Sequence, residues 1–241
     1  MSNFTIIQKL FFLIALLIPT NLRAEDLFLR NYGHSQFLIQ GNDVSILINP
    51  FKATGCAVNL KEASNVERDF ILASSRLADE GYNPSNSLMF VDPGTYKYKD
   101  LIINGISIPH DRFKGRRFGM ATVWTWRQSD FKIVHMSGAA GNITFEDQIL
   151  INRPDILFIS IGGGEKSYSG KEAAEIVKII NPKIIIPVHF NKDNKNIEGC
   201  ELTNENQFLE NSSEYKVKYV GDTFRIKSNR NKNKLIYIFK K

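Results

Sequence analysis

Several features are scarce in this sequence, and their absence narrows the class of protein. The 241 residues include only two cysteines and four histidines, and no internal repeat or low-complexity linker is evident. After residue 24, no apolar run is long enough to span a bilayer. A hydrophobic content of 43% with 23% charged residues is ordinary for a folded protein. At this length we expect a single domain over residues 25–241.

A dominant charge of one sign is also missing. The formal net charge is +6, but Asp and Glu are spread among the basic residues. The one basic run, residues 227–234, has no interleaved aromatic residues, which is typical of a solvated turn. We therefore expect a small-molecule ligand or substrate rather than a nucleic acid. The oligomeric state stays open.

The first 24 residues have the layout of a secretory signal peptide. Lys9 precedes an apolar run over residues 10–18, and a short polar stretch then leads to Ala24. The run is short for a membrane span, although an uncleaved anchor is the alternative interpretation. We expect cleavage after Ala24, which would place the mature chain in the periplasm or outside the cell.

A strand, a helix and a second strand form the best-defined part of the sequence. The apolar run Asp155–Ile161 predicts a buried strand. Ser169 and Glu172 then form a capping box, followed by apolar residues at helical spacing. Lys183–Val188 predicts a second buried strand, parallel to the first, and delivers His189 at its carboxyl end. Ligands bind at that edge of α/β sheets.

Strands dominate the first half of the chain. Asn104-Gly105 predicts a hairpin, because this dipeptide is a strong signal for a tight turn. Trp124 and Trp126 share one face of a predicted strand, and we expect both in the core. Two mixed sheets between helices would satisfy this order of elements, so the fold class is α/β. A terminal antiparallel group is expected from Tyr215–Val220, Thr223–Lys227 and Leu235–Phe239.

The four histidines share a position relative to the strands. His34, His110, His135 and His189 each follow or end a short apolar run. A single histidine there would be explained as a strand end that bonds a neighbouring carbonyl. Four of them indicate one shared site, and imidazole is the commonest ligand for borderline metals.

Three stretches carry a resemblance to a known family. Residues 32–51 contain Gly-His-Ser-Gln-Phe-Leu-Ile and Leu-Ile-Asn-Pro, residues 110–124 begin with His-Asp, and residues 161–189 run from Ile-Gly-Gly to Pro-Val-His. In this order and spacing they resemble the metallo-β-lactamase fold, in its branch of lactonase-like and phospholipase D-like hydrolases. The resemblance implies an αββα sandwich of two mixed β-sheets flanked by helices.

The metal-binding motif of that family is degenerate here. The family's His-x-His-x-Asp-His is replaced by Ser75-Arg-Leu77-Ala-Asp79-Glu80, and the aspartate of its His-x-Gly-Asp turn matches Gly138. The resemblance therefore implies a reduced ligand set of Asp79, His110 and His189, with His34 and His135 in the pocket.

Two classes of function remain open. The lost ligands favour an exported, non-catalytic member that uses the pocket for binding, with no metal or one weakly bound divalent ion. The alternative is a metal-dependent hydrolase of an ester, lactone or phosphodiester. It would keep one zinc, manganese or iron ion, because carboxylate-rich ligand sets suit the harder ions. In either case Asp79 and Glu80 are the candidate catalytic carboxylates.

The two cysteines lie in loops that follow strands entering the expected site. The geometry of the family would bring the loops of Cys56 and Cys200 together. Two unpaired thiols are the alternative. Export favours a disulfide, because an oxidising compartment permits the bond.

Overall fold

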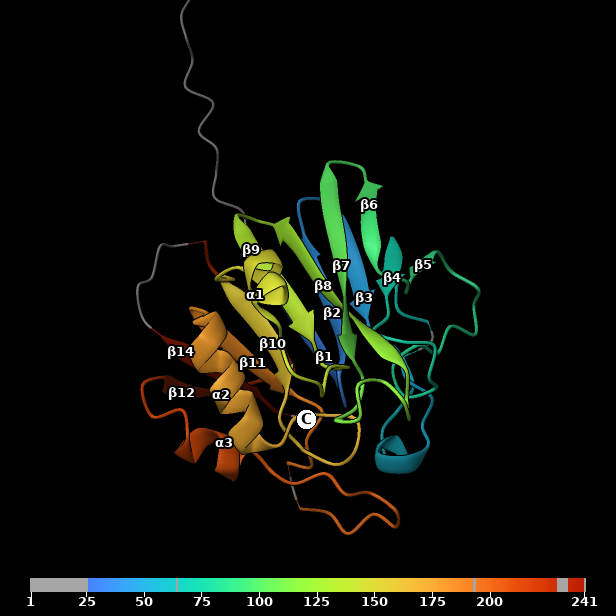
Figure 1. Cartoon of the computed structure of the whole chain (residues 1–241). Coiled ribbons are helices and arrows are strands. Elements are labelled where there is room, and N and C mark those ends of the chain that lie inside the picture. The colour runs from blue at the N-terminus through green and yellow to red at the C-terminus, as the bar shows by residue number, and fades with distance from the viewer. Residues whose placement is uncertain (1–25, 64, 193, 229–233, 241) are drawn as a thin grey trace, which may run out of the picture.

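Two β-sheets face each other in the computed structural model, which describes residues 26–63, 65–192, 194–228 and 234–240 (Figure 1). Within these ranges the smaller sheet has six strands. Its neighbours pair antiparallel from β13 to β3 and parallel from β3 to β5. In spatial order the strands are β13 (Thr223–Ile226), β1 (Leu27–Gly33), β2 (Gln36–Gly41), β3 (Val44–Ile48), β4 (Phe70–Leu72) and β5 (Met89–Phe90).

The larger sheet has eight strands in the same ranges. It is parallel from β12 to β9 and antiparallel from β9 to β6, so both sheets are mixed. In spatial order its strands are β12 (Lys216–Val220), β14 (Leu235–Phe239), β11 (Ile184–Val188), β10 (Ile156–Ser160), β9 (Phe131–Met136), β8 (Met120–Gln128), β7 (Leu101–Pro109) and β6 (Gly94–Tyr98).

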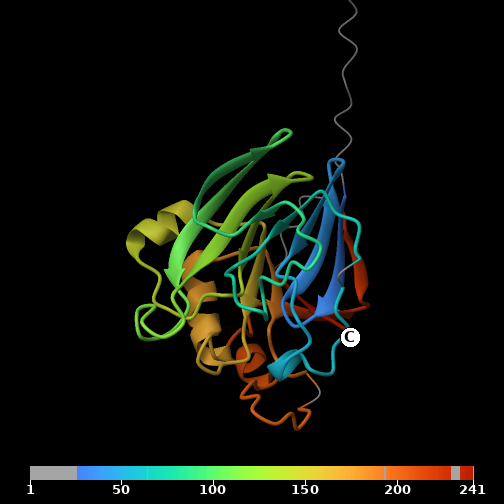
Figure 2. The ribbon, with the colours of Figure 1, turned by 90° about the vertical axis from the view of Figure 1, so that its right-hand side faces the viewer.

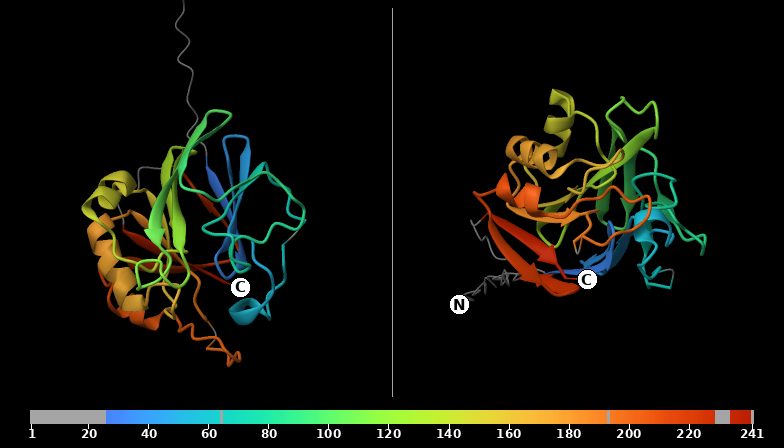
Figure 3. Two further views of the ribbon diagram at one scale, coloured as in Figure 1. Left: turned by 45° about the vertical axis from the view of Figure 1, so that its right-hand side comes forward. Right: turned by 90° about the horizontal axis from the view of Figure 1, so that it is seen from below.

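Helices cover the outer face of the larger sheet (Figure 3). They are α1 (Phe145–Ile151), α2 (Gly170–Ile180) and α3 (Asn206–Glu210). The outer face of the smaller sheet packs instead against irregular segments that include Val66. The 3-10 turn η1 (Gly55–Ala57) lies between β3 and β4 in the chain. The two-sheet sandwich is therefore as predicted, but one of its two outer layers consists of loops in the described part of the chain.

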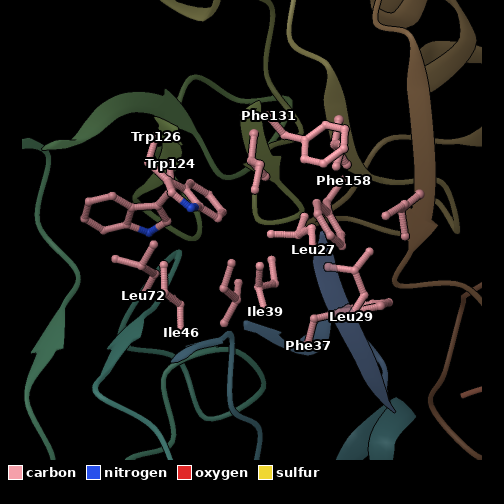
Figure 4. Packing of buried hydrophobic residues seen from close by; sticks show 14 of the residues in the cluster. Leu27, Leu29, Phe37, Ile39, Ile46, Leu72, Trp124, Trp126, Phe131 and Phe158 are labelled. Carbon is pink, nitrogen blue, oxygen red and sulfur yellow. The ribbon is translucent and has the colours of Figure 1, made fainter. Parts of the chain in front are cut away.

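The core between the sheets is aromatic and aliphatic (Figure 4). Trp124 and Trp126 are 0% and 2% exposed, which confirms that they belong to the core. The indole Nε1 of Trp124 donates a hydrogen bond of 2.9 Å to the carbonyl of Ala73, which directly follows β4. Phe37 of the smaller sheet meets Phe158 of the larger one edge to face, with ring centroids 5.1 Å apart. These contacts fix the two sheets against each other.

The predicted strand, helix and strand form the centre of the larger sheet. β10 and β11 pair in parallel, and α2 begins with the Ser169 and Glu172 capping box. Its buried face consists of Ala173, Ala174, Ile176, Val177 and Ile180, which lie at helical spacing. The carboxyl end of β11 leads into His189, as expected.

Two expectations about the strands are wrong. Residues 101–109 form one continuous strand, so Asn104-Gly105 is not a turn. A Cβ atom on Gly105 would lie 2.7 Å from Thr122 Cγ2 and 2.9 Å from Trp124 Cζ3. Glycine is therefore present because β7 and β8 approach closely there. The last three strands also do not form one antiparallel group, since β12 pairs in parallel with β14 and β13 joins the other sheet.

The expected signal peptide lies outside the described residues, as does most of the basic run of residues 227–234. Among the described residues, none of the helices has the length and apolar character that crossing a membrane requires. Cleavage after Ala24 therefore stays a prediction.

Candidate functional site

A cavity of about 430 Å³ opens at the edge where strands of both sheets end. Its walls come from loops that are distant in the sequence, at the lower edge of the molecule in Figure 1. The side chains that bear on its chemistry are His34, Asp79, Phe118, Lys166, His189 and Glu201.

Two histidines and an aspartate converge in this cavity. His34, Asp79 and His189 each offer one ligand atom, and these atoms lie within 4.8 Å of one another. The two imidazole centroids are 4.1 Å apart, and the backbone N–H of His189 donates to the carbonyl of His34 at 2.9 Å. Both residues adopt positive φ values, 54° and 53°, which are uncommon for residues with a side chain. The backbone is thus strained where it aims the two rings at each other.

Burial keeps both imidazoles neutral. It lowers the pKa of His34 to about 4, although the carboxylates of Asp79 and Glu80 act in the opposite direction. Burial also holds the pKa of His189 well below its usual value, and the nearby positive charge of Lys166 adds to the effect. Neutral imidazoles have a free lone pair at neutral pH, as a metal ligand requires.

The ammonium group of Lys166 forms an ion pair with the Asp79 carboxylate. Burial alone would raise the pKa of Asp79, but the charge and hydrogen bond of Lys166 bring it below the usual value. The same ammonium lies 5.7 Å from the ring centroid of Phe118, within reach of a cation–π interaction. Asp79 therefore already has a positive partner from the protein itself.

His110 does not join this group and pairs with Glu80 instead. The two side chains are only 1% and 7% exposed. Burial would lower the pKa of His110, but the Glu80 carboxylate raises it above the usual value. Ser75 Oγ donates to Glu80 Oε1 at 3.0 Å. Two of the candidate site residues thus form a buried ion pair with each other.

A hydrogen-bond network extends from Glu80 into the core. The amide nitrogen of Asn49 donates to Ser137 Oγ at 2.6 Å and to Ser74 Oγ at 3.0 Å, and it lies 3.4 Å from Glu80 Oε2. Its amide oxygen accepts from the backbone N–H of Ser74 at 2.8 Å. Four residues that are all buried satisfy one another here.

Gly138 closes the same side of the site. A Cβ atom built there would lie 2.6 Å from Ser74 Cβ and 2.7 Å from Glu80 Oε2, closer than real contacts allow. This position has no room for the aspartate of the resembled family while Ser74 and Glu80 keep their places.

His135 is buried between the sheets and is not among the described residues that line the cavity. Its ring centroid lies 5.3 Å from that of Phe158, and burial lowers its pKa to about 3. Of the two histidines expected in the pocket, His34 is at its centre and His135 belongs to the core.

The predicted disulfide between Cys56 and Cys200 is present, with the Cα atoms 4.9 Å apart. It joins the η1 segment to the loop after β11, and these segments lie side by side at the bottom of Figure 2. Cys56 lines the large cavity and also a smaller one of about 120 Å³. The bond therefore fixes one wall of the site.

Two residues of the site were not found by reading the sequence. Lys166 follows the three glycines after β10, and no motif around it in the sequence indicates a role in the site. Asn49 stands in Leu-Ile-Asn-Pro, where the resembled family has an aspartate, so its sequence did contain a signal.

Comparison with known proteins identifies the family. The beta-lactamase superfamily domain matches residues 29–189, which is more than half of the chain. The chain belongs to the metallo-β-lactamase superfamily. A UPF0173 protein of Pyrococcus abyssi is 28% identical over 180 residues, covering 66% of this chain and 81% of the relative. A UPF0173 metal-dependent hydrolase of Thermococcus onnurineus is 26% identical over 193 residues, covering 67% and 84%.

Solved structures agree on the fold. A candidate zinc-dependent hydrolase of the metallo-β-lactamase superfamily from Thermotoga maritima superposes with a TM-score of 0.68 at 20% identity, covering 88% of this chain and 98% of the other. A candidate metal-dependent hydrolase from Parabacteroides distasonis superposes with a TM-score of 0.58 at 13% identity, covering 78% of this chain and 88% of the other. These structures support the two-sheet sandwich.

The residues of this superfamily member fit one metal ion better than two. On one side, Glu80 already pairs with Nε2 of His110, and Gly138 has no room for a ligand side chain. On the other side, His34, Asp79 and His189 offer two nitrogens and an oxygen, which suits zinc, manganese or iron. Lys166 competes for the only carboxylate in that second set.

Proposed function

We propose that this chain is an exported member of the superfamily that binds a small molecule in the large cavity without a two-metal centre. The observation that carries the proposal is the buried ion pair between Glu80 and His110. A metal on that side would have to break the pair and take both groups into its own coordination shell. Each group would then lose a partner that also compensates for its burial.

The surroundings of the pair support the same proposal. Asn49 donates hydrogen bonds to Ser74 and Ser137 behind Glu80, and Ser75 donates to the Glu80 carboxylate. The carboxylate and these polar groups therefore have protein partners, while Nδ1 of His110 has none among the described residues. Gly138 adds a steric reason, because its surroundings leave no space for a bridging carboxylate.

A one-metal hydrolase is the second candidate function, favoured by the convergence of His34, Asp79 and His189. An ion held by these three residues would act as a Lewis acid and bring the pKa of a bound water toward about 7. The substrate would be an ester, a lactone or a phosphodiester. In this candidate the cavity walls, including Phe118, hold the substrate beside the ion.

Metal content and turnover distinguish the two candidates. The protein would be purified without chelator, analysed for zinc, manganese and iron, and assayed on an aryl ester, a lactone and a phosphodiester with each metal added. We expect less than one equivalent of metal and no turnover above that of an Asp79→Asn variant. Metal-dependent turnover that this variant loses would favour the one-metal hydrolase and overturn the proposal.

Export has its own test. Expression of the full chain in a Gram-negative host, followed by fractionation and sequencing of the protein's N-terminus, should give a mature chain that begins at Glu25. A cytoplasmic protein that retains residues 1–24 would contradict export without affecting the proposal about the site.

A further inference from the structure

Lys166 is held by a loop with a fixed shape. This loop joins β10 to α2, and it is closed by a hydrogen bond from the Gly163 N–H to the Tyr168 carbonyl at 2.8 Å. The Ser167 hydroxyl donates to the Gly163 carbonyl at 2.7 Å. Both bonds are internal to the loop, so the backbone on either side of Lys166 is restrained.

A neighbouring segment fixes the loop from outside. The guanidinium of Arg112 donates to the carbonyls of Gly164 and Ser167 at 2.5 and 3.0 Å, and it also pairs with Glu172 at the start of α2. Arg117 pairs with Glu165, directly before Lys166. The ammonium of Lys166 therefore reaches the cavity from a backbone that is anchored at several points.

The ammonium contacts the carboxylate that a metal would need. Asp79 is the only acid in the group with His34 and His189, and Lys166 holds its Oδ2 atom. The side chains of Lys166 and Asp79 are 26% and 23% exposed, so solvent screens the pair only in part. A divalent ion and an ammonium on one carboxylate repel each other at such short range.

We propose that Lys166 is a built-in competitor for the cation site formed by His34, Asp79 and His189. A divalent metal ion binds there only when it displaces the ammonium from Asp79. The inference rests on the proposed function, because it explains how this side of the site is stable without metal. It also assigns Lys166 as the residue that sets the metal affinity of the site.

Calorimetric titration of the metal-free protein with Mn²⁺ and with Zn²⁺ tests the inference. Lys166→Met removes the charge and keeps an unbranched side chain, so it should bind Mn²⁺ about tenfold more tightly or better, as expected if an ion pair of about 1.4 kcal/mol no longer competes. Lys166→Arg keeps the charge and should bind like the parent chain. Lys171→Met, on an exposed part of α2, is the matched control and should change nothing.

Electron paramagnetic resonance of free Mn²⁺ gives an independent count of bound metal. The gain in Lys166→Met should disappear when Asp79→Asn is added. If Lys166→Met unfolds, as seen in its circular dichroism, Lys166→Gln replaces it. Equal affinity of the folded variant and the parent chain would overturn the inference, whether both bind metal or neither does. Hydrolysis by the parent chain would overturn the proposed function alone, since the affinity ratio would still be measurable.

Discussion

The two sides of the site differ in how their carboxylates are held. On the closed side, Glu80 and His110 are buried, paired and connected to Asn49. On the open side, His34, Asp79 and His189 face a cavity. Each side has a carboxylate next to imidazole, so residue type alone does not explain why one side is closed and the other faces the cavity. The two carboxylates differ in their other contacts. Glu80 contacts buried residues of the core, whereas Asp79 contacts a loop lysine that is partly exposed to solvent.

This contrast is the basis of our proposal that the fold is kept here without a two-metal centre. A buried carboxylate needs a positive partner or several donors. Glu80 has His110 as its positive partner, and Ser75 and Asn49 as hydrogen-bond donors. Glu80 in turn gives the buried His110 a charged partner, and we propose that this pair takes the place of an ion.

The largest expected effect concerns the closed side. His110→Leu leaves the Glu80 carboxylate buried without its charged partner, and this should lower the free energy of unfolding by about 3–5 kcal/mol. Adding Glu80→Gln removes the unpaired charge, so the double variant should be more stable than the sum of the single changes predicts. Urea denaturation measures all three variants.

Arg76→Gln is the matched control for this experiment. Arg76 and Asp92 form a salt bridge whose side chains are 65% and 67% exposed, so its removal should cost less than about 1 kcal/mol. If His110→Leu costs no more than this control, the closed side is not held by its ion pair.

A smaller loss is expected at Gly138. Gly138→Asp places a side chain against Ser74 and a negative charge beside Glu80, so it should destabilise the fold by about 1–3 kcal/mol or more. It should also fail to raise zinc binding. Gly221→Asp is the control, because a Cβ atom there meets nothing closer than 3.6 Å. A stable Gly138→Asp protein that gains zinc would show that the closed side can reopen.

The smallest effect near neutral pH is a pH dependence carried by His135. Its pKa in the folded protein is about 3, below the value of about 6.5 for an unfolded chain, so the unfolded state binds the proton first as the pH falls. The contribution of His135 to the free energy of unfolding is therefore full above pH 6.5. It decreases by about 1.4 kcal/mol for each pH unit as the pH falls from 6.5 to 3. His135→Leu should reduce this slope in urea titrations at several pH values. An unchanged slope would mean that His135 is not buried as a neutral group.

The other three histidines also contribute to the pH dependence. His34, whose pKa is lowered to about 4, and His189, whose pKa burial holds well below its usual value, both contribute a loss of the same sign as the pH falls below 6.5. The stability of the parent chain should therefore depend on pH more steeply than one histidine predicts. The contribution of His110 changes with pH in the opposite direction, because its pKa is raised in the folded protein. It stabilises the fold fully below pH 6.5, and this stabilisation is lost as the pH rises through the pKa of the folded state. The His135→Leu comparison isolates one group from this sum.

The fold was largely predictable because its signals are local. The capping box at Ser169 and the apolar run before His189 are each visible within a few residues of sequence, and both are present in the structure. The wrong prediction of a turn at Gly105 has a non-local cause, because glycine is needed there to make room for side chains of the neighbouring strand β8. Periodicity within one segment contains no information about such a neighbour.

The site was predictable only in part for the same reason. Asp79 and His189 meet as their positions at the family's sheet edge imply. Lys166 lies 87 residues from its partner Asp79, on a loop whose shape depends on Arg112 and Glu172. The pairing of Glu80 with His110 likewise depends on packing around Gly138. No spacing in the sequence indicates either contact.

Zinc-soaked crystals test the central claim most directly. Anomalous diffraction at the zinc edge should show no ion between Glu80 and His110, with their ion pair intact, and at most one partly occupied ion beside His34, Asp79 and His189. Two well-occupied zinc ions, one of them bound by His110 after separation from Glu80, would contradict the account.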